Sequence, residues 1–177
     1  MSCLDIPRTA VRALVDVLSH ADPAVLVQAV SAAHALPPLE RCADVPALRA
    51  VVPPPADSAT RARVAKLEVG LTEAQALIDT GQWPAALRAT APLVHEAREV
   101  AYEPALAEAL AARAWLEHQT GQSVTSTKTF EGAFEAGVAG RRDDIAAASS
   151  AALIGIYGYV LDHPDESRLW ERLTQAF

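Results

Sequence analysis

The sequence has few lysines and no dense cluster of basic residues. Lys66 and Lys128 are the only lysines among fifteen Lys and Arg residues in a chain of 177, and the net charge is −7. The one adjacent basic pair, Arg141-Arg142, is followed at once by Asp143-Asp144. Phosphate backbones and anionic lipid surfaces require clustered Lys and Arg. The charge pattern therefore argues against nucleic acid and anionic membranes as partners, and it favours a basic or neutral partner.

Long apolar runs are also missing. None approaches the roughly 20 residues that a transmembrane helix needs. The first residues, Met1–Asp5, have neither the basic region nor the apolar region of a secretory signal peptide. They lead directly into helix-forming sequence, which favours a segment of a longer protein.

Motifs for catalysis, cofactors and metals are absent from the sequence. It contains neither a G-x-G-x-x-G nor a G-x-x-x-x-G-K phosphate loop, and no G-x-S-x-G nucleophile motif. His95-Glu96 lacks the second histidine of a zinc-binding H-E-x-x-H helix. The five histidines are scattered over different predicted helices and turns: His20, His34, His95, His118 and His163. We therefore expect no enzymatic activity, no cofactor and no metal site in this chain.

Cysteine is scarce, since Cys3 and Cys42 are the only two. Two thiols without C-x-x-C spacing are too few for a zinc site. The residues alone leave two interpretations open. The thiols are either isolated and buried in a reduced protein, or joined in a disulfide that closes the first helical pair.

Alanine is the most abundant residue, and the apolar residues recur at helical spacing. No segment alternates as a strand does, so the sequence predicts an all-α fold. The helix after Asp22 is expected to bury Leu26, Ala29, Val30 and Ala33, and Pro92 is expected to kink or break its helix. Before the prolines, the predicted helices run from Pro7 to Ser19 and from Pro23 to Pro37, and a short helix after Asp44 carries Val45, Leu48 and Val51. After the prolines, they run from Ser58 to Ile78, from Pro84 to Ala97, from Pro104 to Leu116, from Asp143 to Val160 and from Pro164 to Leu173. A further helix begins after Gln122, and Gly137 and Gly140 are predicted to end it.

A run of prolines divides the chain, and a repeat follows it. Residues 53–55 must be extended, because each proline excludes the α conformation for the residue before it. We expect an N-terminal helical segment at 1–52, a Pro-rich linker at 53–57 and repeats at 58–177. Gly81-Gln82 recurs as Gly121-Gln122, and a third step of 40 residues reaches Leu161-Asp162. Two helices per unit of this size predict a right-handed α-solenoid.

Side chains at fixed distances before these turns define a candidate partner groove. Trp115 lies about 180° around its helix from Leu106 and shares its side with polar residues, a composition typical of interaction hot spots. The alternative is that Trp115 packs in the core. The candidate groove residues are Glu68, Gln75, Asp79, Glu108, Trp115, His118, Gln119 and Tyr159.

These features predict a module that binds a protein or peptide. Two alternatives remain open. One is a structural or oligomerising spacer without a groove, in which case the chain forms a homo-oligomer. The other is a small-molecule sensor with a pocket between the N-terminal helices and the repeats.

The turn and second helix of each unit carry Gly81, Trp83 and Ala86, then Gly121, Phe130 and Ala133, and finally Trp170. These residues resemble the tetratricopeptide repeat, whose motif is Gly-x-Tyr-x-x-Ala-x-x-x-Phe-x-x-Ala. Residues that depart from the motif are Thr90, Leu93, Ser123 and Ser126. The resemblance implies paired helices that bind a protein or peptide.

The N-terminal stretches Cys3–Asp5, Ala13–Leu18, Ala35–Leu39 and Cys42–Val45 carry a second resemblance. They look like the region that joins the kinase domain to the repeats in large myxobacterial serine/threonine protein kinases. This implies a regulatory or sensor part, since no His-Arg-Asp or Asp-Phe-Gly motif is present. If that family's membrane span precedes this segment, the segment lies on the extracytoplasmic side and its two cysteines are expected to pair. Otherwise it is cytoplasmic.

Overall fold

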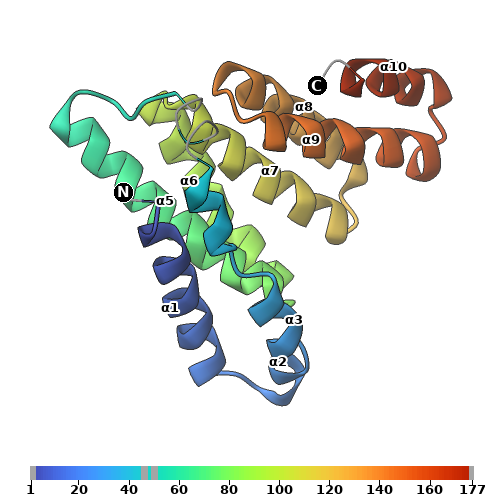
Figure 1. The fold of residues 1–177 in the computed structure, drawn as a ribbon. Helices are drawn as coiled ribbons and strands as arrows, with labels where there is room; N and C mark the ends of the chain where they lie inside the picture. The colour runs from blue at the N-terminus through green and yellow to red at the C-terminus, as the bar shows by residue number, and fades with distance from the viewer. Residues whose placement is uncertain (1–2, 45–47, 49–51, 176–177) are drawn as a thin grey trace.

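The computed structural model describes residues 3–44, 48 and 52–175. Throughout these residues the regular structure is helical, with nine α-helices and no strand, so the all-α prediction is confirmed for the part described (Figure 1). The elements are α1 (Asp5–Ser19), α2 (Pro23–Val27), α3 (Ala29–His34), the 3₁₀ helix η1 (Leu39–Ala43), α5 (Ser58–Asp79), α6 (Trp83–Val100), α7 (Glu103–Gln119), α8 (Ser123–Ala139), α9 (Asp143–Gly155), the π-helical turn η2 (Ile156–Val160) and α10 (Pro164–Thr174).

The N-terminal helices pack on one side of α5, where α1 buries Ala10, Ala13 and Leu14 (Figure 1). Asp22 caps α2 as expected, because the Val25 N–H donates to its Oδ1 atom at 2.9 Å. The prediction of one helix from Pro23 to Pro37 is wrong, since the helix ends at Val27 and restarts at Ala29.

The buried side of this segment also differs from the predicted one. Val25 and Ala32 are buried, whereas Leu26 and Val30 are 54% and 72% exposed and Ala33 is also exposed. The predicted apolar face is therefore wrong, because the buried side follows Val25, Ala29 and Ala32, which keep helical spacing across Gln28. The helix predicted after Asp44 lies outside the described residues except for Leu48, whose N–H donates to the Asp44 carbonyl.

From α5 onward, each helix packs against the next one along the chain, and the turns between them have two or three residues (Figure 1). Each turn contains one residue in the left-handed region. These residues are Gly81, Ala101, Gly121, Arg141 and Asp162, separated by 20, 20, 20 and 21 positions. The left-handed residue lets the next N–H groups reach the last carbonyls of the helix, as Gln82 N–H does to Leu77 and Gln122 N–H to Glu117.

The single extra residue in the last interval has a local cause. In η2 the Leu161 N–H donates to the Ile156 carbonyl, five residues back, at 3.0 Å. A π-helical turn accommodates one more residue than an α-helical turn. In the turn between η2 and α10, the left-handed residue is therefore Asp162, one position beyond the Leu161 that the 40-residue spacing reaches.

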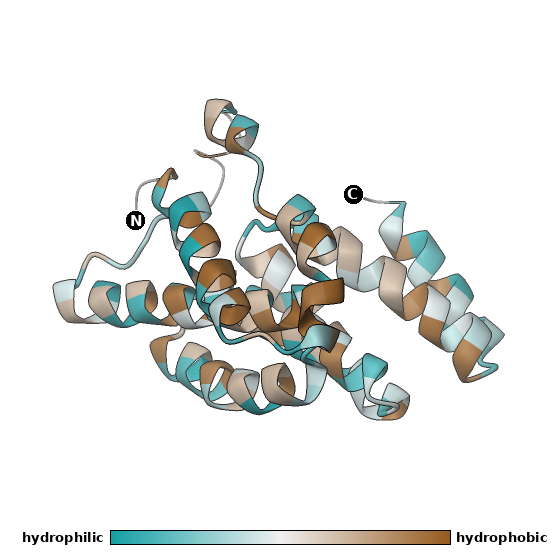
Figure 2. Ribbon diagram, turned by 90° about the horizontal axis from the view of Figure 1, so that it is seen from below, coloured by the Kyte–Doolittle hydropathy of each residue, from teal (hydrophilic) through white to brown (hydrophobic). Residues whose placement is uncertain are grey.

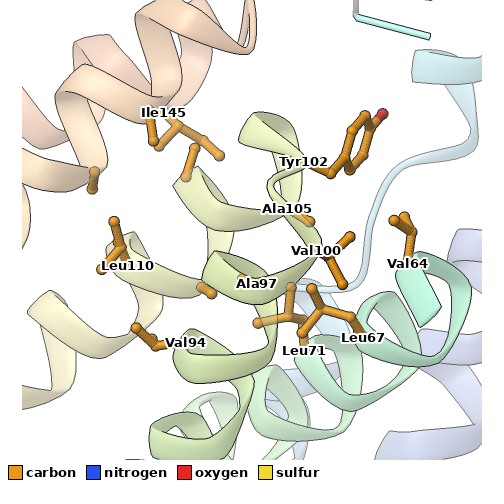
Figure 3. Packing of buried hydrophobic residues seen from close by; sticks show 14 residues of the cluster. Val64, Leu67, Leu71, Val94, Ala97, Val100, Tyr102, Ala105, Leu110 and Ile145 are labelled. Carbon is orange, nitrogen blue, oxygen red and sulfur yellow. The ribbon is translucent and has the colours of Figure 1, made fainter. Parts of the chain in front are cut away.

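Alanine residues bring the helices close together. Ala86, Ala107, Ala109, Ala114, Ala133 and Ala146 have no measurable exposure. Larger side chains from α5, α6, α7 and α9 fill the main core, including Leu67, Leu71, Val94, Leu110 and Ile145 (Figure 3). A second cluster near the C-terminal end contains Ala114, Phe130, Leu153, Ile156 and Trp170. Figure 2 shows hydrophobic and hydrophilic residues mixed along each helix, as expected where only one side is buried.

Two helix-breaking predictions are corrected by the structure. Helix α6 runs from Trp83 to Val100 through Pro92, so the expected break is absent. Because Pro92 is exposed, water can bond the Arg88 carbonyl that lacks its usual N–H partner. Gly137 also does not end its helix, which continues to Ala139. A Cβ atom on Gly137 would lie 3.0 Å from the Ala146 backbone nitrogen, so glycine permits the close contact of α8 with α9.

The proline run forms no helix, and the residue before it is bonded to the start of α7. The Tyr102 hydroxyl donates to the Val52 carbonyl at 2.9 Å. Asp57 then caps α5, accepting from the Thr60 N–H at 2.7 Å, and this bond lowers the pKa of Asp57. In the described part of the chain no helix has the length and hydropathy to cross a membrane.

Candidate functional site

Three of the predicted groove residues line one cavity. Gln75 and Asp79 on α5 and Glu108 on α7 contribute to a cavity of about 160 Å³. The N-terminal segment forms the facing wall. The remaining lining residues are Ile6, Ala10, Leu14, Ala35, Leu36, Pro37, Thr72 and Ala76. The cavity is therefore apolar on the side of α1 and the residues after α3, and largely polar on the side of the repeats.

Carboxylates dominate the polar side of this cavity. The Gln75 Nε2 atom donates to Asp79 Oδ1 at 2.8 Å. Burial raises the pKa of Asp79. Burial also raises the pKa of Glu68, and the nearby Glu108 carboxylate raises it further. A cationic group that enters here would therefore relieve an unfavourable negative charge.

Arg142 is the cation that the structure already places beside this cluster. Its guanidinium lies 3.4 Å from Glu108 Oε2 and 2.9 Å from Asp144 Oδ1. Arg142 was not among the predicted groove residues, because Asp143 and Asp144 follow it directly in the sequence. The pairing with Asp144 neutralises part of its charge, while the contact with Glu108 connects the start of α9 to α7.

Trp115 lies outside the cavity and is half-buried. Its ring contacts Trp83 edge to face, with the centroids 5.8 Å apart, and it packs beside the second hydrophobic cluster. His118 and Gln119 are near the same end of α7, where the His118 Nδ1 atom lies 3.2 Å from the Ser123 hydroxyl. The structure does not bring these three residues to the cavity lining.

Tyr159 is 91% exposed on the π-helical turn η2 and is also absent from the cavity lining. The eight predicted groove residues therefore divide into an acidic group at α5 and α7, an aromatic and polar group at the end of α7, and an isolated Tyr159. The sequence analysis missed the apolar wall of the cavity. A hydrophobic pattern predicts that Leu14 is buried but does not reveal which helix it faces.

Glu117 has an unexpected role. Charged residues such as Arg113 and Glu117 are usually exposed on a helix surface. Glu117 is only 2% exposed, and its carboxylate accepts from Arg113 Nε at 2.8 Å and from the Thr129 hydroxyl at 2.6 Å. These bonds compensate the buried charge and join α7 to α8.

A disulfide joins Cys3 to Cys42, with Cα atoms 5.7 Å apart. It links Cys3, two positions before α1, to Cys42 in η1, and it leaves no free cysteine. The two parts of the N-terminal segment that line the acidic cavity, α1 and the residues after α3, are therefore linked twice. The disulfide joins them at one end and the chain through the α1–α2 turn joins them at the other.

Within the described ranges, no three His, Cys, Asp or Glu side chains are arranged to hold a metal ion. Comparisons with protein-family models, with curated proteins and with solved structures find no match to this chain. The function is therefore inferred from the fold of this chain, and its acidic face on α5 and α7 under apolar residues of the N-terminal segment indicates the kind of partner.

Proposed function

We propose that this chain is a helical-repeat module that binds a protein or peptide, with α5 to α10 as three tetratricopeptide-like helix pairs of a right-handed solenoid. The single observation that carries the proposal is the regular placement of the left-handed turn residues at 81, 101, 121, 141 and 162. Regular stacking of helix pairs produces extended faces, which repeat proteins use to bind their partners.

The acidic cavity supports the choice of partner. A peptide with a Lys or Arg side chain beside an apolar residue matches its two walls, since the acids attract the cation and Leu14 and Leu36 accept apolar atoms. Burial raises the pKa of Asp79 in the cavity lining, so a bound cation gains a favourable interaction with this carboxylate. We infer that the partner is basic, in agreement with the net charge of −7.

The small-molecule alternative is favoured by the same cavity, because it lies between the N-terminal helices and the repeats. Its volume argues against this function. Pockets for drug-sized ligands have volumes of about 300–1,000 Å³, whereas this cavity has about 160 Å³. One side chain of a peptide fits such a space better than a whole organic ligand does.

The spacer alternative is favoured by apolar side chains on the outer surface of the N-terminal segment. Val15, Val27 and Val30 are each at least 60% exposed. If these residues join two copies, sedimentation equilibrium will give a dimer and the acidic cavity will bind no peptide. A monomer would remove the support for this alternative.

The wider context rests on the resemblance of the N-terminal stretches alone. On that basis we propose that the module is the regulatory or sensor part of a serine/threonine protein kinase, carried on the extracytoplasmic side of its membrane. A disulfide between Cys3 and Cys42 suits an oxidising compartment.

Selection of peptides from a random library on the whole chain tests the binding function. We expect the selected peptides to contain a Lys or Arg next to an apolar residue. Their affinity should fall about tenfold in the double variant Asp79→Asn with Glu108→Gln, because charge-assisted hydrogen bonds contribute about 1.5–3 kcal/mol. The control Glu73→Gln with Glu135→Gln removes two exposed acids outside the cavity and should bind normally. Failure to select any peptide would contradict the proposal.

A further inference from the structure

A second cavity, of about 250 Å³, lies between α6, α7 and α8. Its lining residues are Ala91, Val94, His95, Arg98, Leu110, Arg113 and Thr129. Leu110 and Arg113 lie about 160° and 140° around α7 from Glu108. The second cavity is therefore on the other side of α7 from the acidic one and belongs to a separate site.

The charge of this lining is opposite to that of the whole chain. Two arginines and one histidine contribute to it and no carboxylate does, although the net charge is −7. Arg98 is exposed and forms no ion pair with any residue in the described part of the chain. Its guanidinium is thus available to a ligand.

The Arg113 side chain is positioned by the carboxylate of Glu117. Its Nε atom donates to Glu117 Oε1 at 2.8 Å, and Thr129 donates to the other carboxylate oxygen of Glu117 at 2.6 Å. Because a guanidinium has five N–H donors, the two terminal nitrogens of Arg113 keep four for other acceptors. The Glu117 carboxylate is 2% exposed, so it orients the guanidinium without occupying the cavity.

We propose that this cavity binds the carboxylate group of a ligand between Arg98 and Arg113, with the aliphatic part of that ligand on Ala91, Val94 and Leu110. Glu117 neutralises one of the two guanidinium charges, which leaves the positive charge of Arg98 in the lining. A carboxylate carries the one negative charge that balances this site, whereas a phosphate group carries about 1.5 to 2 at neutral pH. This site is independent of the proposed peptide function.

Chemical-shift titration of the whole chain tests the assignment, with butyrate as the carboxylate, butyramide as its neutral analogue and inorganic phosphate as the competing anion. Butyrate should shift the amides of residues 91–98, 110–113 and 129, and butyramide should not. Arg98→Gln should weaken butyrate binding about tenfold, since it removes a charge-assisted bond without touching the buried pair. Arg88→Gln replaces an exposed arginine of the same helix outside the cavity and should bind butyrate normally.

Three results would overturn the proposal. One is an Arg98→Gln variant that keeps the wild-type affinity for butyrate while its spectrum shows that it is folded. Another is a set of butyrate shifts spread over the surface and reproduced by butyramide. The third is tighter binding of phosphate than of butyrate, which would assign the site to a different anion.

Discussion

At the scale of single residues, the buried carboxylate of Glu117 joins α7 to α8. Its two partners come from α7 and α8, and each bond is shorter than 3 Å. Removal of a partner from a buried ion pair leaves a charge without compensation, which costs more free energy than the pair contributes by forming.

Replacement of Arg113 by methionine should therefore destabilise the chain. We expect Arg113→Met to lower the free energy of unfolding by about 2 kcal/mol, less than the loss of a fully buried pair, because Thr129 still donates to Glu117. Urea denaturation gives the value. Arg88→Met, at an exposed arginine of α6, is the control and should change stability by less than about 0.5 kcal/mol. If both variants were equally stable, the buried Glu117 carboxylate would not depend on Arg113 for its compensation.

The acidic cavity has its own residue-scale consequence. Burial raises the pKa values of Glu68 and Asp79 in the folded chain. Folding is therefore favoured by their protonated forms, and this contribution is lost as the pH rises through their folded pKa values. Glu68→Gln and Asp79→Asn should raise the melting temperature at pH 7, and the gain should shrink as the pH falls through the raised folded pKa values and vanish below the unfolded values of about 4. A gain that grows toward acidic pH would contradict the raised pKa values.

At the scale of helices and turns, the left-handed residues set the length of each unit. Gly81 and Gly121 adopt φ values of 76° and 82°, which suit glycine, while Ala101 and Arg141 adopt 53° and 54° with a Cβ atom present. A left-handed conformation costs an L-residue about 1–2 kcal/mol. The turns are therefore maintained by the packing of the helices and not only by local preference.

Exchange of alanine and glycine at two turns tests this argument. Gly121→Ala should lower the free energy of unfolding by about 1 kcal/mol, because its new Cβ atom meets no neighbour within 4 Å and only the backbone is strained. Ala101→Gly should leave stability unchanged or raise it by less than about 1 kcal/mol. Thermal unfolding measures both. A Gly121→Ala variant that is more stable than the wild type, or an Ala101→Gly variant that is less stable, would show that the turns have a different conformation in solution.

The sequence predicts these elements where local chemistry is explicit. Asp22, Asp57 and the glycine turns mark helix ends through side chains that act within three residues. It fails where tertiary contacts decide. Nothing local indicated that the helix would break at Gln28 or continue through Pro92, and the extra residue in η2 is visible only through its backbone bonds. The sequence indicated the polar wall of the cavity through Gln75, Asp79 and Glu108, but not the apolar residues that face it, since Leu14 and Asp79 are 65 positions apart.

At the scale of the whole molecule, the N-terminal segment covers the face of the repeats that was predicted to bind a partner. Helix α1 packs on α5 and contributes Ile6, Ala10 and Leu14 to the acidic cavity. The disulfide from Cys3 to Cys42 spans 39 residues and keeps this segment together. Access to the acidic face therefore depends on how firmly the segment is held.

Removal of the disulfide should destabilise this cover more than the repeats. A disulfide that closes a loop of about 40 residues lowers the conformational entropy of the unfolded chain. In the simple loop model this stabilises the folded chain by roughly 4 kcal/mol at 25 °C. We expect Cys3→Ser with Cys42→Ser to lower the stability of α1 to α3 and to increase amide exchange there, with α6 to α9 unchanged. Free-thiol titration of the unreduced wild type should give no reactive thiol. Two thiols would contradict the disulfide.

The central claim is that α5 and α7 form a peptide-binding face beneath the N-terminal segment, and hydrogen-exchange mass spectrometry with a selected basic peptide tests it most directly. The account predicts added protection in residues 68–79 and in the α7 turn around Glu108. It also predicts that this protection disappears in the Asp79→Asn, Glu108→Gln double variant. Protection confined to other helices, or retained in that variant, would contradict the claim.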